Sequence, residues 1–234
     1  MTHLSVIVPT RDRLDTAQLI AARLFSLFPQ VQLEVIVVAP AAQPLPASPG
    51  RVRFVADAGR GVYPAFTAGL NQARGQYVWF IGDDDYPLDA AGALSAELLA
   101  ARADVLVAPV LFSSGRLYRP TRSRLILHFL NWCQQGVIYR RELLMRYRFF
   151  RRLPVQADQY VNVRLRCDPR VSIRFLPVPI CMFGVNGASG SIQDLGYRRL
   201  RPALAYRTLG CGRFLAFRAL LCVEPLVKKL VKIR

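Results

Sequence analysis

The sequence is poor in the residues that build disulfide frameworks and zinc sites. Its five cysteines are odd in number, and no two of them form a CxxC pair, so neither arrangement is favoured and a reducing cytosol is the natural compartment. The two histidines, His3 and His128, are far apart in the chain. The sequence therefore offers no histidine or cysteine cluster that competes with a carboxylate metal site.

Long hydrophobic runs are also missing. No uncharged stretch reaches the ~18 residues that a membrane-spanning helix needs, and the apolar run in the N-terminal MTHLSVIVPTRDR is too short for a signal peptide. The 234 residues are nevertheless 53% hydrophobic, with a positive mean hydropathy. This composition excludes a disordered chain and fits one large α/β domain, alone or with a short appendage.

Acidic residues are scarce relative to basic ones. Fifteen Asp and Glu stand against 32 Lys and Arg, which gives a formal charge of +17. Nucleic acid, an anionic membrane surface and phosphate-bearing substrates are the partner classes that such an excess favours. Residues 1–110 are nearly balanced, and most of the excess lies after Arg116.

The first half of the chain alternates β-branched runs with segments of helical periodicity. This alternation is typical of a mostly parallel sheet covered by helices. The pattern predicts strands over 4–8, 33–38, 51–55 and 77–81, and helices over 14–27 and 64–75. Downstream it predicts helices over 88–101, 140–147 and 158–167, strands over 105–112 and 136–139, extended chain over 171–182, and a basic helix from Tyr197 to the end.

Polar residues follow three of the predicted strands. They are Thr10 to Arg13, Asp57 to Gly61, and Asp83 to Asp85. Because ligands of parallel sheets bind at the carboxyl ends of the strands, these residues are expected along one edge. The proline-dense segment 39–50 is expected to form a mobile loop near them.

The three consecutive aspartates in YVWFIGDDDYP have two interpretations. One aspartate is enough to cap the helix predicted from Leu88, since a negative charge suits a helix N-terminus. Three carboxylates after a buried strand exceed that need. Hard carboxylate oxygens suit Mg²⁺ or Mn²⁺, which usually keep waters and bridge to substrate phosphates, so a divalent metal is the sharper hypothesis.

Three segments carry a resemblance to a known family. LSVIVPTRDR, LEVIVV and GRGVYPAFTAGLNQARGQYVWFIGDDDYP, in this order and spacing, resemble the nucleotide-sugar-binding half of a family 2 glycosyltransferase. The resemblance covers roughly residues 3–190. It implies an α/β, Rossmann-like GT-A fold over 1–192, with a nucleotide-sugar-binding half (1–110) and an acceptor half (111–192). A basic amphipathic tail, 193–234, would follow.

The resemblance also implies roles for individual residues and a metal cofactor, Mn²⁺ or Mg²⁺. Asp83 and Asp85 fit the family's DxD spacing as metal ligands, and Asp84 is expected to contact the substrate or to replace Asp83. The remaining substrate-binding residues would be Pro9, Thr10 and Arg11 after the first strand, Asp57 at the base or ribose, and Arg60 at the diphosphate.

The family's second carboxylate removes the proton of the acceptor hydroxyl. PVQADQYVNVRL resembles the segment that carries it, and Asp158 is the candidate base, although the same residue also suits the N-cap of the following helix. Attack by the activated hydroxyl would invert the anomeric carbon. CMFGVNGASGS, 181–191, resembles a Gly-Ser segment that would act as a lid over the diphosphate or as a plain loop.

The sequence also departs from the family pattern. Ala39-Pro40 replaces an aspartate pair that relatives often have after the second strand, and Pro64 and Thr67 replace polar groups in the segment GVYPAFTAG. Cys133-Gln134-Gln135 replaces a His-Gln pair. These departures predict an unusual donor or acceptor pocket.

The basic tail predicts either an interfacial membrane helix or a helix packed on the domain. The first alternative fits a peripheral enzyme on the cytoplasmic face of the membrane, with a glycan or polyprenyl-linked acceptor. A sugar nucleotidyltransferase is the first rival function, but PTRDRLD lacks its Gly-rich phosphate loop. The second rival is a basic nucleic-acid-binding protein, but no recognition motif supports it and no nucleic-acid partner is expected.

Overall fold

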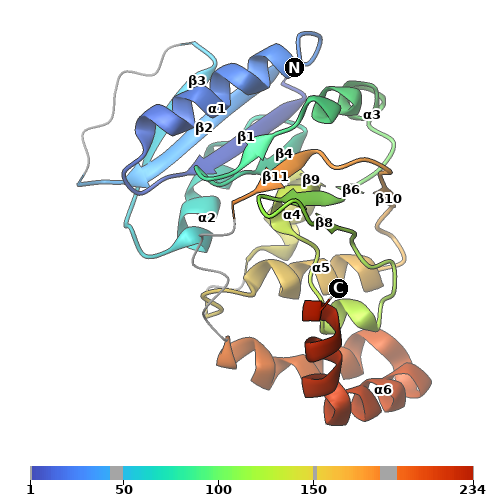
Figure 1. The fold of residues 1–234 in the computed structure, drawn as a ribbon. Coiled ribbons are helices and arrows are strands. Elements are labelled where there is room, and N and C mark those ends of the chain that lie inside the picture. The colour runs from blue at the N-terminus through green and yellow to red at the C-terminus, as the bar shows by residue number, and fades with distance from the viewer. Residues whose placement is uncertain (1, 43–49, 150–151, 185–193, 234) are drawn as a thin grey trace.

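A mostly parallel seven-stranded sheet forms the centre of the computed structural model, which describes residues 2–42, 50–149, 152–184 and 194–233 (Figure 1). In spatial order its strands are β10 (Ile173–Phe175), β6 (Val105–Val107), β9 (Val137–Arg140), β4 (Tyr77–Phe80), β1 (Leu4–Pro9), β2 (Leu33–Pro40) and β3 (Val52–Asp57). All neighbours are parallel except β9, which lies antiparallel between β4 and β6. The predicted α/β architecture is therefore confirmed.

The central strands are buried on both faces, which explains their continuous apolar sequences. Along β2, Val35 and Val37 pack into one core, whereas Ile36 and Val38 pack into the other. The two cores lie on opposite faces of the sheet because successive side chains of a strand alternate in direction. The sheet is thus the middle layer of three.

Helices form the two outer layers. One face carries α1 and the η1–α3 segment, and the other carries α2, α4 and α5 (Figure 1). Two further 3₁₀ turns precede β9. The bounds are α1 (Leu14–Leu27), α2 (Val62–Gln72), η1 (Asp89–Leu94), α3 (Ser95–Ala100), η2 (Ile126–His128), η3 (Gln134–Gly136), α4 (Arg141–Tyr147), α5 (Ala157–Cys167) and α6 (Leu195–Ile233).

The strand predicted over 105–112 is in fact two strands in different sheets. Pro109 lacks an N–H for the ladder, and the N–H of Ala108 donates to the carbonyl of Gly136, so the chain leaves the central sheet at this point. A second, four-stranded sheet results, in the order β5 (Tyr86–Pro87), β11 (Cys181–Phe183), β7 (Val110–Phe112) and β8 (Leu117–Tyr118). It brings β11 beside the aspartate segment.

Other predicted elements also need correction. The segment 88–101 is a 3₁₀ turn followed by a short α-helix, and η1 passes so close to α1 that a Cβ on Gly92 would lie 3.0 Å from the Leu27 carbonyl oxygen. The extended segment 171–182 is divided by Pro177 and Pro179 into β10 and β11. Most of the loop predicted as mobile, and the lid predicted within 181–191, fall on residues 43–49 and 185–193, outside the described residues.

The tail helix packs on the domain. It begins at Leu195 and breaks at Gly210, whose φ of 72° is a left-handed conformation that favours glycine. Ala205, Leu209 and Phe217, from both sides of the break, are buried against the segment that contains η2. The buried Arg201 guanidinium holds both carboxylate oxygens of Glu224, which joins the two halves of α6.

The domain-packing alternative for the tail therefore holds for residues 195–224. Within the part of the chain that the structure describes, no helix is long and apolar enough to cross a membrane. Leu215 and Tyr206 remain 70% and 65% exposed on α6.

Candidate active site

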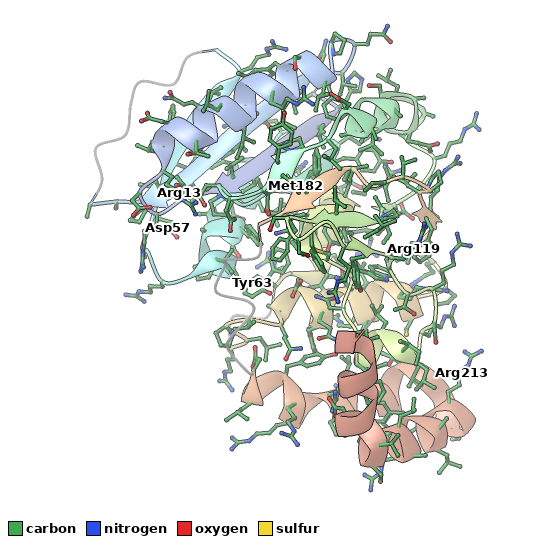
Figure 2. The ribbon with its side chains drawn as sticks, viewed as in Figure 1. Arg13, Asp57, Tyr63, Arg119, Met182 and Arg213 are labelled. Carbon is green, nitrogen blue, oxygen red and sulfur yellow. The ribbon has the colours of Figure 1, made fainter. Side chains whose placement is uncertain are left out.

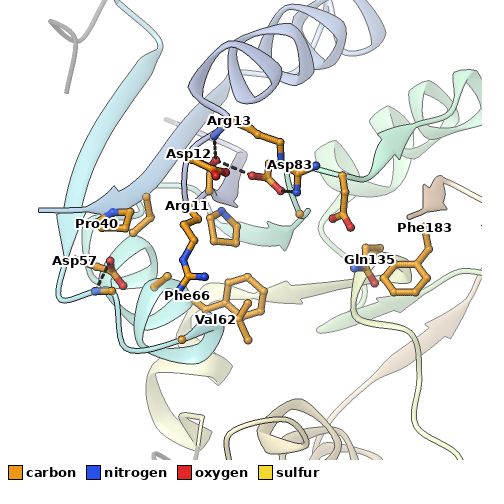
Figure 3. A pocket seen from close by; sticks show the side chains of 18 residues that line it. Arg11, Asp12, Arg13, Pro40, Asp57, Val62, Phe66, Asp83, Gln135 and Phe183 are labelled. Atoms are coloured by element: carbon orange, nitrogen blue, oxygen red, sulfur yellow. Dashed lines mark hydrogen bonds and ion pairs between the residues drawn. The ribbon is translucent and has the colours of Figure 1, made fainter. Parts of the chain in front are cut away.

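A pocket of about 540 Å³ opens at the carboxyl edge of the central sheet (Figure 3). Its walls come from the segments after β1, β2, β3 and β4, from the start of α2, and from Gln135 and Phe183. Sequence segments that are far apart thus meet here, as the strand-end argument predicted. Six predicted residues line it, Pro9, Thr10, Arg11, Asp57, Asp83 and Asp84, whereas Arg60, Asp85 and Asp158 do not.

Asp83 is held by two residues that follow β1. Thr10 Oγ1 donates to Asp83 Oδ2 at 2.6 Å, and Arg13 Nη2 pairs with Asp83 Oδ1 at 2.6 Å. Thr10 Oγ1 also accepts the Arg13 N–H at 3.0 Å, which fixes the turn before α1. The positive charge nearest to Asp83 is therefore Arg13, a residue that the sequence analysis placed at this edge without giving it a role.

Asp85 is buried next to the pocket and bound to main-chain donors. Its carboxylate accepts the N–H of Gly82 at 2.6 Å and that of Gly184 at 3.2 Å. Burial, with a smaller contribution from the neighbouring charge of Asp84, raises the pKa of Asp85 to about 6. Gln135 donates a further hydrogen bond to this carboxylate.

Asp84 lines the pocket, and no hydrogen bond or ion pair among the described residues uses its carboxylate. The two flanking glycines leave room for it. A Cβ on Gly82 would lie 2.7 Å from Asp84 Oδ1 and 2.9 Å from Asp85 Oδ2, and a Cβ on Gly184 would lie 3.0 Å from Asp84 Oδ2. Larger residues at these positions would displace the carboxylates.

The opposite wall is the turn between β3 and α2. Asp57 Oδ1 accepts the N–H of Gly59 at 2.9 Å, and Gly59 and Gly61 have positive φ values of 65° and 112°. This turn presents Asp57 to the pocket, with Val62 and Phe66 from α2 below it (Figure 3). Arg60 is exposed at the tip of the turn, outside the pocket lining.

Asp158 lies in the first turn of α5 within a network of polar side chains. Tyr63 donates its hydroxyl to Asp158 Oδ1 at 2.6 Å, and Asn131 donates its amide to Oδ2 at 2.6 Å. Asn131 Oδ1 in turn accepts from Asn162, and Asn162 Oδ1 accepts from Tyr139 at 2.8 Å. The N-cap of α5 is Gln156, and Asp158 lies two residues further on, inside the helix, so the predicted N-cap position of Asp158 is wrong.

Burial raises the pKa of Asp158 above its usual range, while the hydrogen bonds from Tyr63 and Asn131 act in the opposite direction. Each carboxylate oxygen still has a lone pair that can accept a proton. Tyr63, which donates to Asp158, directly follows Val62 of the pocket lining. Asp158 therefore lies near the pocket without lining it.

Replacing Tyr63 by Phe is expected to shift the pH at which the Asp158 carboxyl titrates. The hydroxyl stabilises the charged form of Asp158, so its loss raises the pKa of that carboxyl further. If Asp158 is the base that the family resemblance implies, the acidic limb of the kcat/KM profile should move to higher pH, with activity recovering above it. The matched control is Tyr147→Phe, which removes a hydroxyl that donates to Asp168, outside the pocket lining. If the acidic limb of the Tyr63→Phe profile stays at the pH of the unmodified protein, the claim that Tyr63 lowers the pKa of Asp158 is contradicted.

The site fits a metal ion that the substrate helps to hold. Among the described residues, no three His, Cys, Asp or Glu side chains converge as an all-protein metal site would require. Mg²⁺ and similar ions usually take one or two carboxylates and complete their shell with phosphate oxygens and water. Asp84, which has no protein partner, supplies such a carboxylate at the pocket wall.

Residues 5–159 match the model described as glycosyl transferase family 2, and these residues include every wall of the pocket except Phe183. The chain belongs to glycosyltransferase family 2. The match also includes the aspartate segment and Asp158.

Curated relatives of this family-2 chain include PGL/p-HBAD biosynthesis glycosyltransferases of Mycobacterium bovis and Mycobacterium tuberculosis. Each is 27% identical over 162 residues, which cover 62% of this chain and 60% of the relative. The chain thus spans about 60% of the length of these relatives. The similarity is to proteins that are named for PGL/p-HBAD biosynthesis.

Among solved structures, residues 1–349 of S. aureus TarS in complex with UDP superpose with a TM-score of 0.65 at 21% identity. The superposition covers 90% of this chain and 67% of that one. The complex of TarS with UDP-GlcNAc gives a TM-score of 0.62 at 19% identity, with 90% and 68% coverage. At such identities the likeness establishes the fold, and it confirms the predicted GT-A architecture.

Proposed function

We propose that this family-2 chain is an inverting glycosyltransferase. It moves a sugar from a nucleotide-diphosphate sugar to a hydroxyl of a glycan or lipid-linked glycan, in the synthesis of a cell-surface polysaccharide or glycolipid. The observation that carries the proposal is the juxtaposition of a pocket lined by Asp57, Arg11 and Asp84 with a buried carboxylate, Asp158, which is held by Tyr63 next to the pocket residue Val62. Family membership favours it over the nucleotidyltransferase and the nucleic-acid-binding protein.

In this proposal the donor nucleotide occupies the pocket between the two walls. Asp57 is placed for hydrogen bonds with the ribose or base, and Arg11 supplies positive charge near the phosphates. Phe66 and Val62 offer apolar surface below them. Arg13 keeps Asp83 neutralised and oriented, so we assign Asp83 a positioning role rather than the metal-ligand role that the family pattern gave it.

Asp158 acts as the general base. Its carboxylate takes the proton of the acceptor hydroxyl, the hydroxyl oxygen bonds to the anomeric carbon, and the bond from that carbon to the diphosphate oxygen breaks. The nucleoside diphosphate leaves with the bonding electrons, and the configuration at carbon inverts. The raised pKa of Asp158 suits this role, because a base is most effective when its pKa approaches the working pH.

Asp84 and Asp85 are the residues that we assign to a bound Mn²⁺ or Mg²⁺. A divalent ion there would offset the negative charge of the diphosphate leaving group. Asp84 contributes the carboxylate without a protein partner, and Asp85 lies beside it on the same side of Gly82.

The membrane is the proposed location of the acceptor. The exposed surface of α6 combines Leu215 and Tyr206 with the cations Arg207 and Arg218. Each cation near an anionic leaflet contributes about 1 kcal/mol. We therefore propose peripheral binding at the cytoplasmic face, through the outer surface of a tail whose inner surface packs on the domain. The names of the mycobacterial relatives agree with a glycolipid product.

A donor panel tests the proposed function. Purified protein is mixed with UDP-, GDP-, CMP- and dTDP-linked sugars, with Mn²⁺ or with EDTA, and thermal stability and released nucleoside phosphate are measured. The TarS complexes make UDP and UDP-GlcNAc the first ligands to test. One donor is expected to raise the melting temperature with Mn²⁺ and much less with EDTA. Failure of every donor, with metal present, would contradict the proposal.

A further inference from the structure

Four arginines converge on a second cavity, remote from the donor pocket. This arginine cavity has a volume of about 570 Å³ and is lined by Arg122, Ser123, Arg124, Leu125, Arg166 and Arg213. Its residues come from three places in the chain: the segment after β8, the last turn of α5, and α6 beyond the break at Gly210. Arg213 lies on α6, at the opposite end of the molecule from Arg13 and Asp57 (Figure 2).

No acidic side chain lines this cavity. Every Asp and Glu of the chain lies within the described residues, yet none forms an ion pair with Arg122, Arg124, Arg166 or Arg213. Burial and the charge of Arg124 both lower the pKa of Arg166. Repulsion between these arginines lowers the stability of the fold. We therefore expect an anion that is not part of the protein to bind between them.

Two of the guanidinium groups are held in place by other parts of the protein. Arg166 donates from Nε and Nη2 to the carbonyl oxygen of Arg122, at 3.2 Å and 2.8 Å. The Arg122 guanidinium lies 5.1 Å from the centre of the Phe175 ring, within the range of a cation–π contact. Guanidinium groups that are already held in place lose little side-chain entropy when they bind phosphate oxygens.

A purely structural explanation covers only part of the cluster. Arg166 complements the partial negative charge at the C-terminus of α5, where cations are favourable. Arg124 and Arg213 belong to other elements and make no hydrogen bond with α5 among the described residues. Their convergence on the same concave surface has no such explanation.

We propose that the arginine cavity binds a phosphate or diphosphate group, carried either by a lipid head or by a soluble compound. The chemistry is the pairing of several planar guanidinium groups with the tetrahedral oxygens of phosphate. Arg166 lies eight residues after Asp158 on α5, which is a rise of about 12 Å. Under the proposed function, on which this link rests, the phosphate of a lipid-linked acceptor would lie within reach of the base.

The test compares binding of inorganic pyrophosphate by the unmodified protein and by Arg124→Gln/Arg213→Gln. These two residues are chosen because neither positions another group. Arg102→Gln/Arg146→Gln is the matched control, since it removes the same charge from two exposed arginines outside this cavity. Calorimetry in EDTA suppresses metal-dependent binding at the donor pocket. Thermal unfolding without ligand confirms that both variants fold.

Pyrophosphate is expected to bind the unmodified protein and the control, and to bind the Arg124/Arg213 variant about tenfold more weakly or worse, because charge-assisted hydrogen bonds are lost. No measurable binding to the unmodified protein, or an equal weakening in both variants, would overturn the proposal. Nucleotide-sugar binding is measured on the same variants and should be unchanged. The phosphate site and the proposed function can therefore fail separately.

Vesicles distinguish the two sources of phosphate. Cosedimentation is measured with phosphatidylcholine vesicles, with and without phosphatidylglycerol. In one outcome, pyrophosphate competes with binding to the anionic vesicles, and the Arg124/Arg213 variant binds them more weakly than the control does. The phosphate group that the cavity binds is then part of a lipid. If all three proteins bind the anionic vesicles equally while the pyrophosphate difference persists, the group belongs to a soluble phosphate compound.

Discussion

Replacing Asp158 by Asn is expected to lower kcat by about 10²- to 10⁴-fold, the range that a positioned general base contributes. An amide of the same size occupies the place of the carboxylate but does not take the proton of the acceptor hydroxyl. Donor binding should be nearly unchanged, because Asp158 does not line the donor pocket. The measurement is steady-state transfer, together with the thermal shift on donor binding.

The control is Asp168→Asn, at the other end of the same helix. Asp168 also accepts a tyrosine hydroxyl, from Tyr147, and pairs with the exposed Arg170. Its loss should leave kcat within a few-fold of the unmodified enzyme. If the Asp158 variant transfers sugar at more than a tenth of the normal rate, Asp158 is not the base.

Replacing Asp84 by Asn is expected to lower activity by more than about 100-fold. Residues that hydrogen-bond to the ligands of a metal typically contribute 10- to 100-fold in affinity or activity, so a residue that binds the metal directly should contribute more. The Mn²⁺ concentration for half-maximal activity should rise as well. The measurement is a titration of activity with Mn²⁺ at saturating donor.

Two further variants make the Asp84 experiment decisive. Asp89→Asn, in η1, removes an exposed carboxylate that pairs with Arg23 and should leave the metal response unchanged. Asp83→Asn releases Arg13 and is expected to change donor affinity rather than metal affinity. If Asp83→Asn shifts the metal titration and Asp84→Asn does not, Asp83 is a metal ligand, as the DxD spacing predicts.

The local sequence was sufficient to predict an element when nearly all of its residues are buried. The run LEVIVV predicts a strand because every residue of β2 from 33 to 39 is buried on one face or the other. The division of 105–112 was not predicted, because the apolar run of three valines and two leucines outweighed Pro109 in the pattern. The antiparallel β9 also has a strand-like sequence, but its place between β4 and β6 depends on tertiary contacts.

The candidate site was predictable to the extent that strand ends determine it. Thr10, Asp57 and Asp83 meet in the pocket because parallel strands end at one edge. The ion pair of Arg13 with Asp83 spans 70 residues, and the hydrogen bond of Tyr63 with Asp158 spans 95 residues. Neither has a local signal. The fourth residue of the pattern TRDR was the only available indication of Arg13.

The placement of β9 has a consequence for how the protein is made. During synthesis, the ribosome releases β4 and β6 before the residues of β9, 137–140, exist, yet in the finished sheet β9 lies between those two strands. Until then β4 has an open edge toward β9, and β6 has no partner on that side. The pocket at the carboxyl edge of the sheet, whose lining includes Gln135 shortly before β9, is therefore completed only after this part of the chain has left the exit tunnel. A chimera that joined residues 1–110 of one relative to residues 111–192 of another would place β9 of one protein between β4 and β6 of the other.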